Sequence, residues 1–90
     1  MLRTMKFGFD PEKSEANKIK HGIDFVHAQA LWDDPDRLKV PARTQGEVRS
    51  MLIGRIGEKR WSAIYTIRGD DVRIISVRRS RTLEVNQYEE

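Results

Sequence analysis

The sequence predicts a small α+β domain in which helices flank a mostly antiparallel sheet. Three observations lead to this prediction. Helical patterns occupy the first third of the chain, four strand-like runs follow them, and short glycine turns separate the last three runs. Ninety residues can build one hydrophobic core, so we expect a single domain over 1–90.

The N-terminal segment predicts a strand and then a helix. Residues 5–9, MKFGF, alternate as a short strand does. Asp10 can cap a helix, and Pro11 suits its first position. Gly22 suits the left-handed position that ends a helix, which makes His21 its last residue.

A second helix is expected over 23–32, IDFVHAQALW. Asp24 is its expected cap, and Pro35 prevents its continuation. Its apolar residues form one stripe that can face a core: Phe25, Ala28, Leu31 and Trp32.

Four strands and a closing helix should follow. The last run is apolar on both faces at its centre, which predicts a central strand covered on one side by helices, and Pro41 suits an edge strand. Residues 82–90 have helical character, so the order is β-α-α-β-β-β-β-α. The predicted strands are RLKVPA (37–42), VRSMLIGRI (48–56), RWSAIYTIR (60–68) and VRIISVRR (72–79).

Composition excludes several classes of protein. The chain has no cysteine, which rules out disulfides and thiolate metal sites. It has no apolar run of the ~18 residues that a membrane span needs, and no signal-peptide core. We therefore expect a cytoplasmic protein that needs no cofactor.

Positive charge is concentrated in the predicted sheet. Residues 43–81 hold ten lysines and arginines against four acidic residues, and nine of the ten are arginines. Arginine suits bidentate phosphate contacts, so this excess indicates a polyanionic partner such as nucleic acid. A solvated basic surface is the alternative.

The last strand brings arginines to its end. Strict alternation places Arg78 and Arg79 on opposite faces, and Arg81 begins the next segment. These side chains could clamp a phosphate, or they could be ordinary surface arginines. The two predicted faces are Val72, Ile74, Ser76 and Arg78, and Arg73, Ile75, Val77 and Arg79.

Aromatic and acidic residues leave alternatives open. Trp61 and Tyr65 could stack on a base or pack in the core. The acidic residues of DDPD (33–36) could attract Mg²⁺, but no further ligand lies at a recognisable spacing, which favours a surface turn. His21 and His27 are six residues apart, which does not suit a metal pair on one helix.

The remaining acid–base groups are His21, Lys20, Tyr65 and Tyr88. One reaction needs little more: metal-free RNA cleavage, in which the ribose 2′-OH attacks its own phosphate. The protein then has to move protons and neutralise charge, for which histidine and arginine are suited. A non-catalytic RNA- or protein-binding module is the rival interpretation.

The chain resembles the BrnT family of toxins from bacterial type II toxin–antitoxin modules. The resemblance covers nearly the whole chain, in the family's order. It rests on FDPEKSEANKIKHGIDF, LWDDP, GEVRSMLIGRI, RGDDVRIISVRRS and EVNQYEE. It implies a RelE-like fold, RNA cleavage that stops translation, and a cognate BrnA-like antitoxin that carries the DNA-binding domain of a toxin–antitoxin hetero-oligomer.

The resemblance also implies site residues, although RelE-like enzymes share no single catalytic set. By position, the family's motif residues become Lys20, His21, Arg73, Arg78, Arg79, Glu84 and Tyr88. Val77 and Ser80 stand where the family usually has alanine, and the last helix lacks the arginines often found there. Combining both lines, we expect catalysis by His21, Lys20, Arg78, Arg79 and Tyr88, and substrate contacts from Arg73, Arg81, Tyr65 and Glu84.

Overall fold

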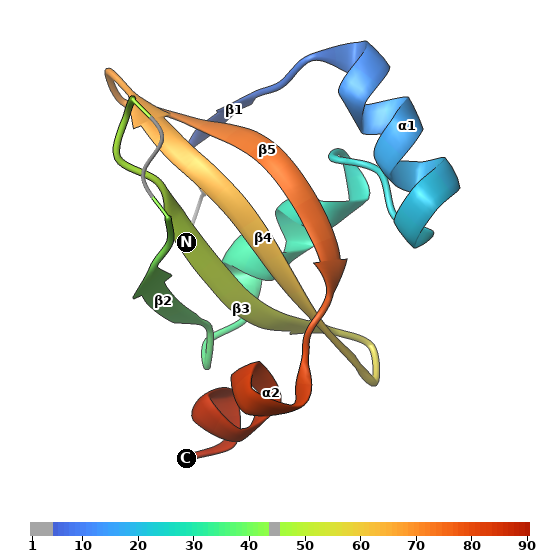
Figure 1. The fold of residues 1–90 in the computed structure, drawn as a ribbon, viewed down its shortest axis with the longest axis vertical. Helices are drawn as coiled ribbons and strands as arrows, with labels where there is room; N and C mark the ends of the chain where they lie inside the picture. The colour runs from blue at the N-terminus through green and yellow to red at the C-terminus, as the bar shows by residue number, and fades with distance from the viewer. Residues whose placement is uncertain (1–4, 44–45) are drawn as a thin grey trace.

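The computed structural model, which describes residues 5–43 and 46–90, contains one five-stranded sheet with helices around it (Figure 1). The sheet order is β1-β5-β4-β3-β2; β1 pairs in parallel with β5, and the other neighbouring pairs are antiparallel. The predicted α+β class is confirmed, and it is consistent with a RelE-like fold. The strands are β1 (Lys6–Gly8), β2 (Leu38–Pro41), β3 (Ser50–Ile56), β4 (Lys59–Arg68) and β5 (Asp71–Arg79).

Helix α1 (Pro11–His21) begins and ends where the sequence predicts. The Asp10 carboxylate accepts a hydrogen bond from the Glu12 backbone N–H at 2.9 Å. Gly22 has φ 85°, a left-handed conformation that favours glycine, and its N–H caps the Lys18 carbonyl. No helix within the described ranges is both long and apolar enough to cross a membrane.

The second predicted α-helix is instead a 3₁₀-helix, η1 (His27–Asp33). The Asp24 carboxylate does cap it, accepting from the His27 N–H at 2.7 Å. The apolar stripe explains the difference, because Phe25, Ala28 and Leu31 are three residues apart. Three is the repeat of a 3₁₀-helix, so this winding turns Ala28 and Leu31 to the same side, while Phe25 lies in the turn before η1; all three are buried.

The main core lies between η1 and one face of the sheet. Leu31 packs so closely on β3 that a Cβ at Gly54 would lie 3.0 Å from its side chain. Trp32 makes edge-to-face contacts with Phe7 and Tyr65, at centroid distances of 5.1 and 5.2 Å. This face is therefore closed to solvent.

A β-bulge in β5 makes the predicted alternation of that strand wrong beyond Ile75. Ser76 pairs with Ile64 and Ile74 pairs with Tyr65, so Ile75 is the extra residue. Val77 consequently returns to the buried face, and Arg79 follows it there, opposite Trp61. Arg78, opposite Ser62, lies on the other face.

The last strand lies inside the sheet, between β1 and β4, as predicted. β4 is the middle strand, and β1 covers only the first three residues of β5. Beyond them α1 covers the open edge through the amide of Asn17. This amide accepts from the Val77 N–H at 3.1 Å and donates to the Val77 carbonyl at 2.9 Å, so it pairs as a neighbouring strand would.

Candidate functional site

The sheet face opposite η1 is lined with arginines. In antiparallel pairs, directly opposed residues point to the same face. Arg55 opposes Arg60 and Arg78 opposes Ser62, which places these side chains together on β3, β4 and β5. Alternation along β4 and its pairing with β5 extend the set, which comprises Arg55, Arg60, Arg68, Arg73 and Arg78. We call these residues the arginine face.

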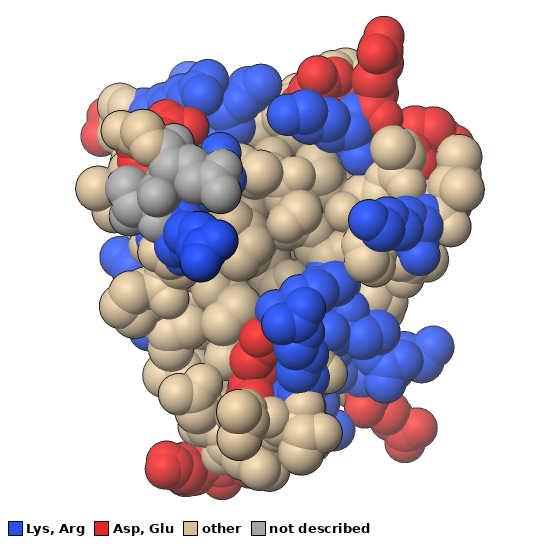
Figure 2. All heavy atoms as spheres, in the orientation of Figure 1, with Lys and Arg blue, Asp and Glu red and all other residues tan. Residues whose placement is uncertain are grey.

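Figure 2 shows lysine and arginine side chains around the uncharged centre of the surface turned to the viewer. The same orientation in Figure 1 has η1 behind the strands, so this surface is the arginine face. The opposite face is filled by the core. A polyanion could therefore contact many cations without disturbing the core.

Helix α2 (Thr82–Glu89) is fastened to this face by Arg78. Both amino groups of Arg78 donate to the two carboxylate oxygens of Glu84, at 2.8 and 2.7 Å. Glu84 also accepts from the Ser62 hydroxyl at 2.8 Å and from the Arg81 N–H at 3.0 Å. The Ser80 hydroxyl lies 2.8 Å from that of Ser62, so Ser80 also belongs to this hydrogen-bond network.

Arg78 and Glu84 form an ion pair in which each residue stabilises the charged form of the other. The hydrogen bonds from Arg78 lower the pKa of Glu84 to about 2, although burial opposes this shift. The hydrogen bond to Glu84 likewise raises the pKa of Arg78. Arg78 thus already holds a carboxylate in the bidentate geometry that a phosphate would need.

Arg79 is held differently. Its guanidinium carbon lies 5.6 Å from the ring centroid of Trp61, and the ring itself is buried. Arg79 is exposed and forms no ion pair with any described residue. Contact with the ring orients its side chain while its N–H donors stay available. Of the two adjacent arginines, Arg79 is the better placed to receive a phosphate.

His21 lies near the end of β5. Asn17 fixes α1 to Val77, and His21 follows Asn17 by one helical turn on the same helix face. Figure 1 shows the last turn of α1 beside the end of β5, where Arg79 is located. His21 is half-buried and Lys20 exposed. Among the described residues, no hydrogen bond or ion pair joins His21 to Arg78 or Arg79.

Tyr88 lies near the C-terminal end of α2 and helps to hold this helix in place. Its hydroxyl donates to the Asp34 carboxylate at 2.6 Å, and that carboxylate also accepts from the Arg55 N–H at 2.8 Å. Burial and this bond raise the pKa of Tyr88 to about 12. Burial opposes ionisation of Asp34, but its hydrogen bonds hold its pKa below the usual value. Tyr88 therefore keeps its proton and would be a poor base.

The remaining predicted substrate residues divide between the two faces. Arg73 is half-buried on the arginine face, and Arg81 is exposed just before α2. Tyr65 is only 4% exposed on the core face, so no surface of its ring is open for a base to stack on. Burial raises the pKa of Tyr65 as well.

Sequence reasoning missed Asp34. The carboxylate was treated as one of several in a surface turn, yet it is buried and joins η1, β3 and α2. Its only local signal was its place in LWDDP, as the second acidic residue after the apolar stripe and directly before Pro35. No group of three or more histidine, cysteine or acidic side chains within the described part of the chain could hold a metal.

Comparison with known families decides between the interpretations. Residues 9–84 match the sequence profile described as "Ribonuclease toxin, BrnT, of type II toxin-antitoxin system". The chain belongs to the BrnT family. This BrnT protein is thus a toxin-antitoxin toxin with ribonuclease activity. A comparison with curated proteins found no match.

The matched span of this BrnT protein contains most of the candidate site. It includes α1 with Lys20 and His21, all of β5, and Glu84 in the first turn of α2. It ends before Tyr88. Both residues of the Arg78–Glu84 ion pair therefore lie within the span that matches the family. The hydrogen bond between Tyr88 and Asp34 has only Asp34 within that span.

Proposed function

We propose that this protein cleaves RNA without a metal ion, through attack of the ribose 2′-OH on the adjacent phosphate. The reaction leaves a 2′,3′-cyclic phosphate and a 5′-hydroxyl end. The observation that carries the proposal is the exposed Arg79, oriented by Trp61 at the end of β5 and close to the last turn of α1. A phosphate bound there would lie near the protein's one half-buried histidine, His21.

Each residue has a chemical task in this proposal. Arg79 neutralises the charge that develops on the phosphorane. His21 transfers a proton, and Lys20, its exposed neighbour, supplies a second cationic donor. Arg73 and Arg81 hold the RNA backbone on either side. Arg78, with Glu84, sets the position of α2 and of the strand end that carries Arg79.

We also propose the biological setting that membership of the family suggests. Cleavage of RNA in the cytoplasm would stop translation, and a cognate BrnA-like antitoxin would prevent it. Because the toxin surface is basic, we propose that the antitoxin covers the arginine face and the end of β5 with acidic residues. DNA would be contacted by the antitoxin rather than by this chain.

The test compares His21→Gln with His27→Gln in cleavage of a defined RNA. Removing a positioned acid or base typically costs about 10²–10⁴-fold in rate, so the first variant should lose this much activity. His27 is exposed at the start of η1 and has no task in the proposal, so it should be dispensable. Wild-type cleavage should persist in excess EDTA and leave cyclic phosphate ends.

Three results would contradict the proposal. Equal cleavage by the two histidine variants would remove His21 from the mechanism. Products with 3′-hydroxyl ends, or activity lost on chelation and restored by Mg²⁺, would show a metal-dependent reaction. Tight RNA binding without any cleavage would favour a binding module that acts as the antitoxin's co-repressor.

A further inference from the structure

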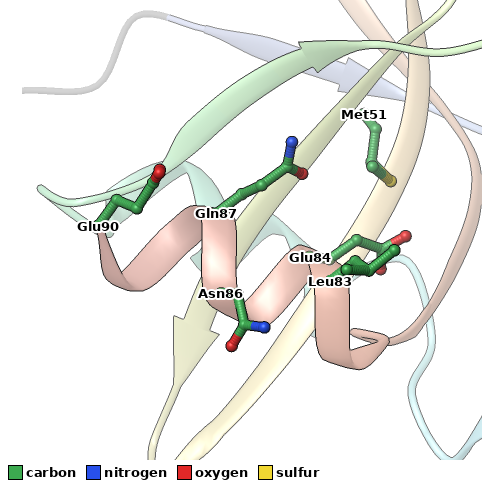
Figure 3. A pocket seen from close by; sticks show the side chains of 6 residues that line it. All are labelled: Met51, Leu83, Glu84, Asn86, Gln87 and Glu90. Atoms are coloured by element: carbon green, nitrogen blue, oxygen red, sulfur yellow. The ribbon is translucent and has the colours of Figure 1, made fainter.

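An open groove of about 510 Å³ lies between α2 and β3 (Figure 3). Met51 forms its floor on β3, and its side chain points toward the first turn of α2, where Leu83 and Glu84 lie. Polar side chains complete the walls toward the C-terminal end of α2. The lining residues are Met51, Leu83, Glu84, Asn86, Gln87 and Glu90.

The apolar part of this groove is unusually accessible. Leu83 is 78% exposed although it lies beside the thioether of Met51. Met51 opposes the half-buried Ile64 of β4, so an apolar row continues from the groove into the centre of the arginine face. Leu83, Met51 and Ile64 thus form a contiguous apolar strip in a concave site, and such strips mark surfaces that bind proteins.

The chemistry of the groove disfavours RNA. No lysine or arginine lines it, and its charged lining residues are Glu84, which is already paired with Arg78, and Glu90, so the groove itself offers no cation to a phosphate. Arg81 is exposed two residues before Leu83, and Met51 continues through Ile64 into the arginine face. An apolar side chain in the groove with acidic neighbours outside it would meet complementary surfaces in both places.

We propose that this groove seats an apolar side chain of the antitoxin, and that acidic residues flanking that side chain contact Arg81 and the arginine face. This inference rests on the proposed function, because it assumes a protein antitoxin. It adds an anchor that is separate from the catalytic residues: Leu83 and Met51 hold the antitoxin, whereas His21 and Arg79 act on RNA.

The test is Leu83→Asp, with Ile19→Asp as its matched control. Both residues are highly exposed, at 78% and 80%, so neither change should disturb the core. Aspartate is also favourable in the first turn of α2. The partner used is the purified product of the gene adjacent to the toxin's own, and affinity, RNA cleavage and melting temperature are measured on the same preparations.

We expect Leu83→Asp to weaken antitoxin binding at least tenfold, the usual cost of losing an apolar anchor, while free-toxin cleavage stays within about twofold of wild type. In cells, the variant should remain toxic when the antitoxin is present. Ile19→Asp should bind normally. If Leu83→Asp lowers the melting temperature, Leu83→Ser serves as the milder variant with the same expectation.

The contrary outcomes are distinct. Unchanged antitoxin affinity in Leu83→Asp, with wild-type cleavage intact, would overturn the groove and leave the proposed function standing. Weaker RNA binding with unchanged antitoxin affinity would assign the groove to RNA. A wild-type chain that neither cleaves RNA nor binds the neighbouring product would overturn both proposals.

Discussion

Arg78 and Arg79 are adjacent in sequence but have different physical situations. The bulge at Ile75 turns Arg78 toward α2, where Glu84 engages both of its amino groups. Arg79 instead lies against Trp61, with no carboxylate partner among the described residues. One arginine therefore serves the fold, and the other remains available for a ligand.

Substitution should separate these two roles. Arg79→Ala should reduce cleavage by about 10²–10³-fold, the usual cost of a lost transition-state charge contact, with little change in stability. Arg78→Ala should destabilise the protein by about 1–3 kcal/mol, since it leaves the largely buried Glu84 carboxylate without its main partner. Urea unfolding and cleavage rates measured on both variants check this; the reverse pattern would assign Arg78 to the substrate.

The sequence could predict that both arginines end the last strand. It could not predict which of them would form an ion pair and which would remain available for a ligand. The bulge at Ile75 carries no glycine or proline signal, so alternation alone gave the wrong faces beyond it. Tyr65 was equally ambiguous, because an aromatic residue on an alternating strand suits either a core or a stacking surface. Tyr65 belongs to the core because η1 packs on its face of the sheet, and this packing is visible only in the structure.

At the scale of elements, α2 depends on polar contacts. It has eight residues and none is buried, so a helix of this length would be marginal alone. Three of its side chains hold it to the sheet and to the end of η1: Glu84 on Arg78, Tyr88 on Asp34, and Glu89 on Arg60. Docking of α2 should therefore be sensitive to charge.

The pKa of Glu84 predicts a pH dependence with a definite sign. The folded state lowers this pKa from 4.5 to about 2, so the contribution to stability is present above pH 4.5 and is lost as the pH falls from 4.5 toward 2. Its size is up to ~3 kcal/mol. Glu84→Gln should flatten this part of the stability profile, as measured by urea unfolding between pH 2 and 6. An unchanged acid-side slope would show that Glu84 is not the group responsible.

The strands and α1 were predictable within about two residues because each has local signals: glycine turns at 57 and 69, alternation, and caps. The contacts of α2 were not. Asp34 and Tyr88 are 54 positions apart, and no local pattern joins them. The winding of η1 lay between these cases, since its three-residue spacing was visible but was interpreted as an α-helical stripe.

At the scale of the whole molecule, the sheet separates two functions. One face holds the core under η1, and the other carries arginines from three strands. Some of these arginines are paired with glutamates, including Arg60, Arg68 and Arg78, whereas Arg73 forms none of the described ion pairs. The basic surface therefore belongs to the fold as a whole and not to one short motif.

Binding to RNA should accordingly depend strongly on salt. The logarithm of the association constant should fall linearly with the logarithm of salt concentration, by about 0.7 for each phosphate neutralised on a single strand. Arg73→Ala should reduce the magnitude of this slope by about 0.7, the contribution of one phosphate contact. Lys13→Ala, which removes an exposed lysine of α1 that is not one of the residues of the arginine face, is the control and should not alter the slope. Equal slopes for wild type and Arg73→Ala would remove Arg73 from the interface.

The pairing of β1 with β5 also has a consequence for synthesis. Among the described strands, β1 has its only sheet neighbour in β5, with Lys6 opposite Asp71. A growing chain on the ribosome cannot complete this sheet until residues 71–79 have been translated, and contacts between such distant positions form late in folding. Asn17 likewise has no strand edge to cap before then. His21 and Arg79 therefore cannot come together in the proposed site until β5 has been translated.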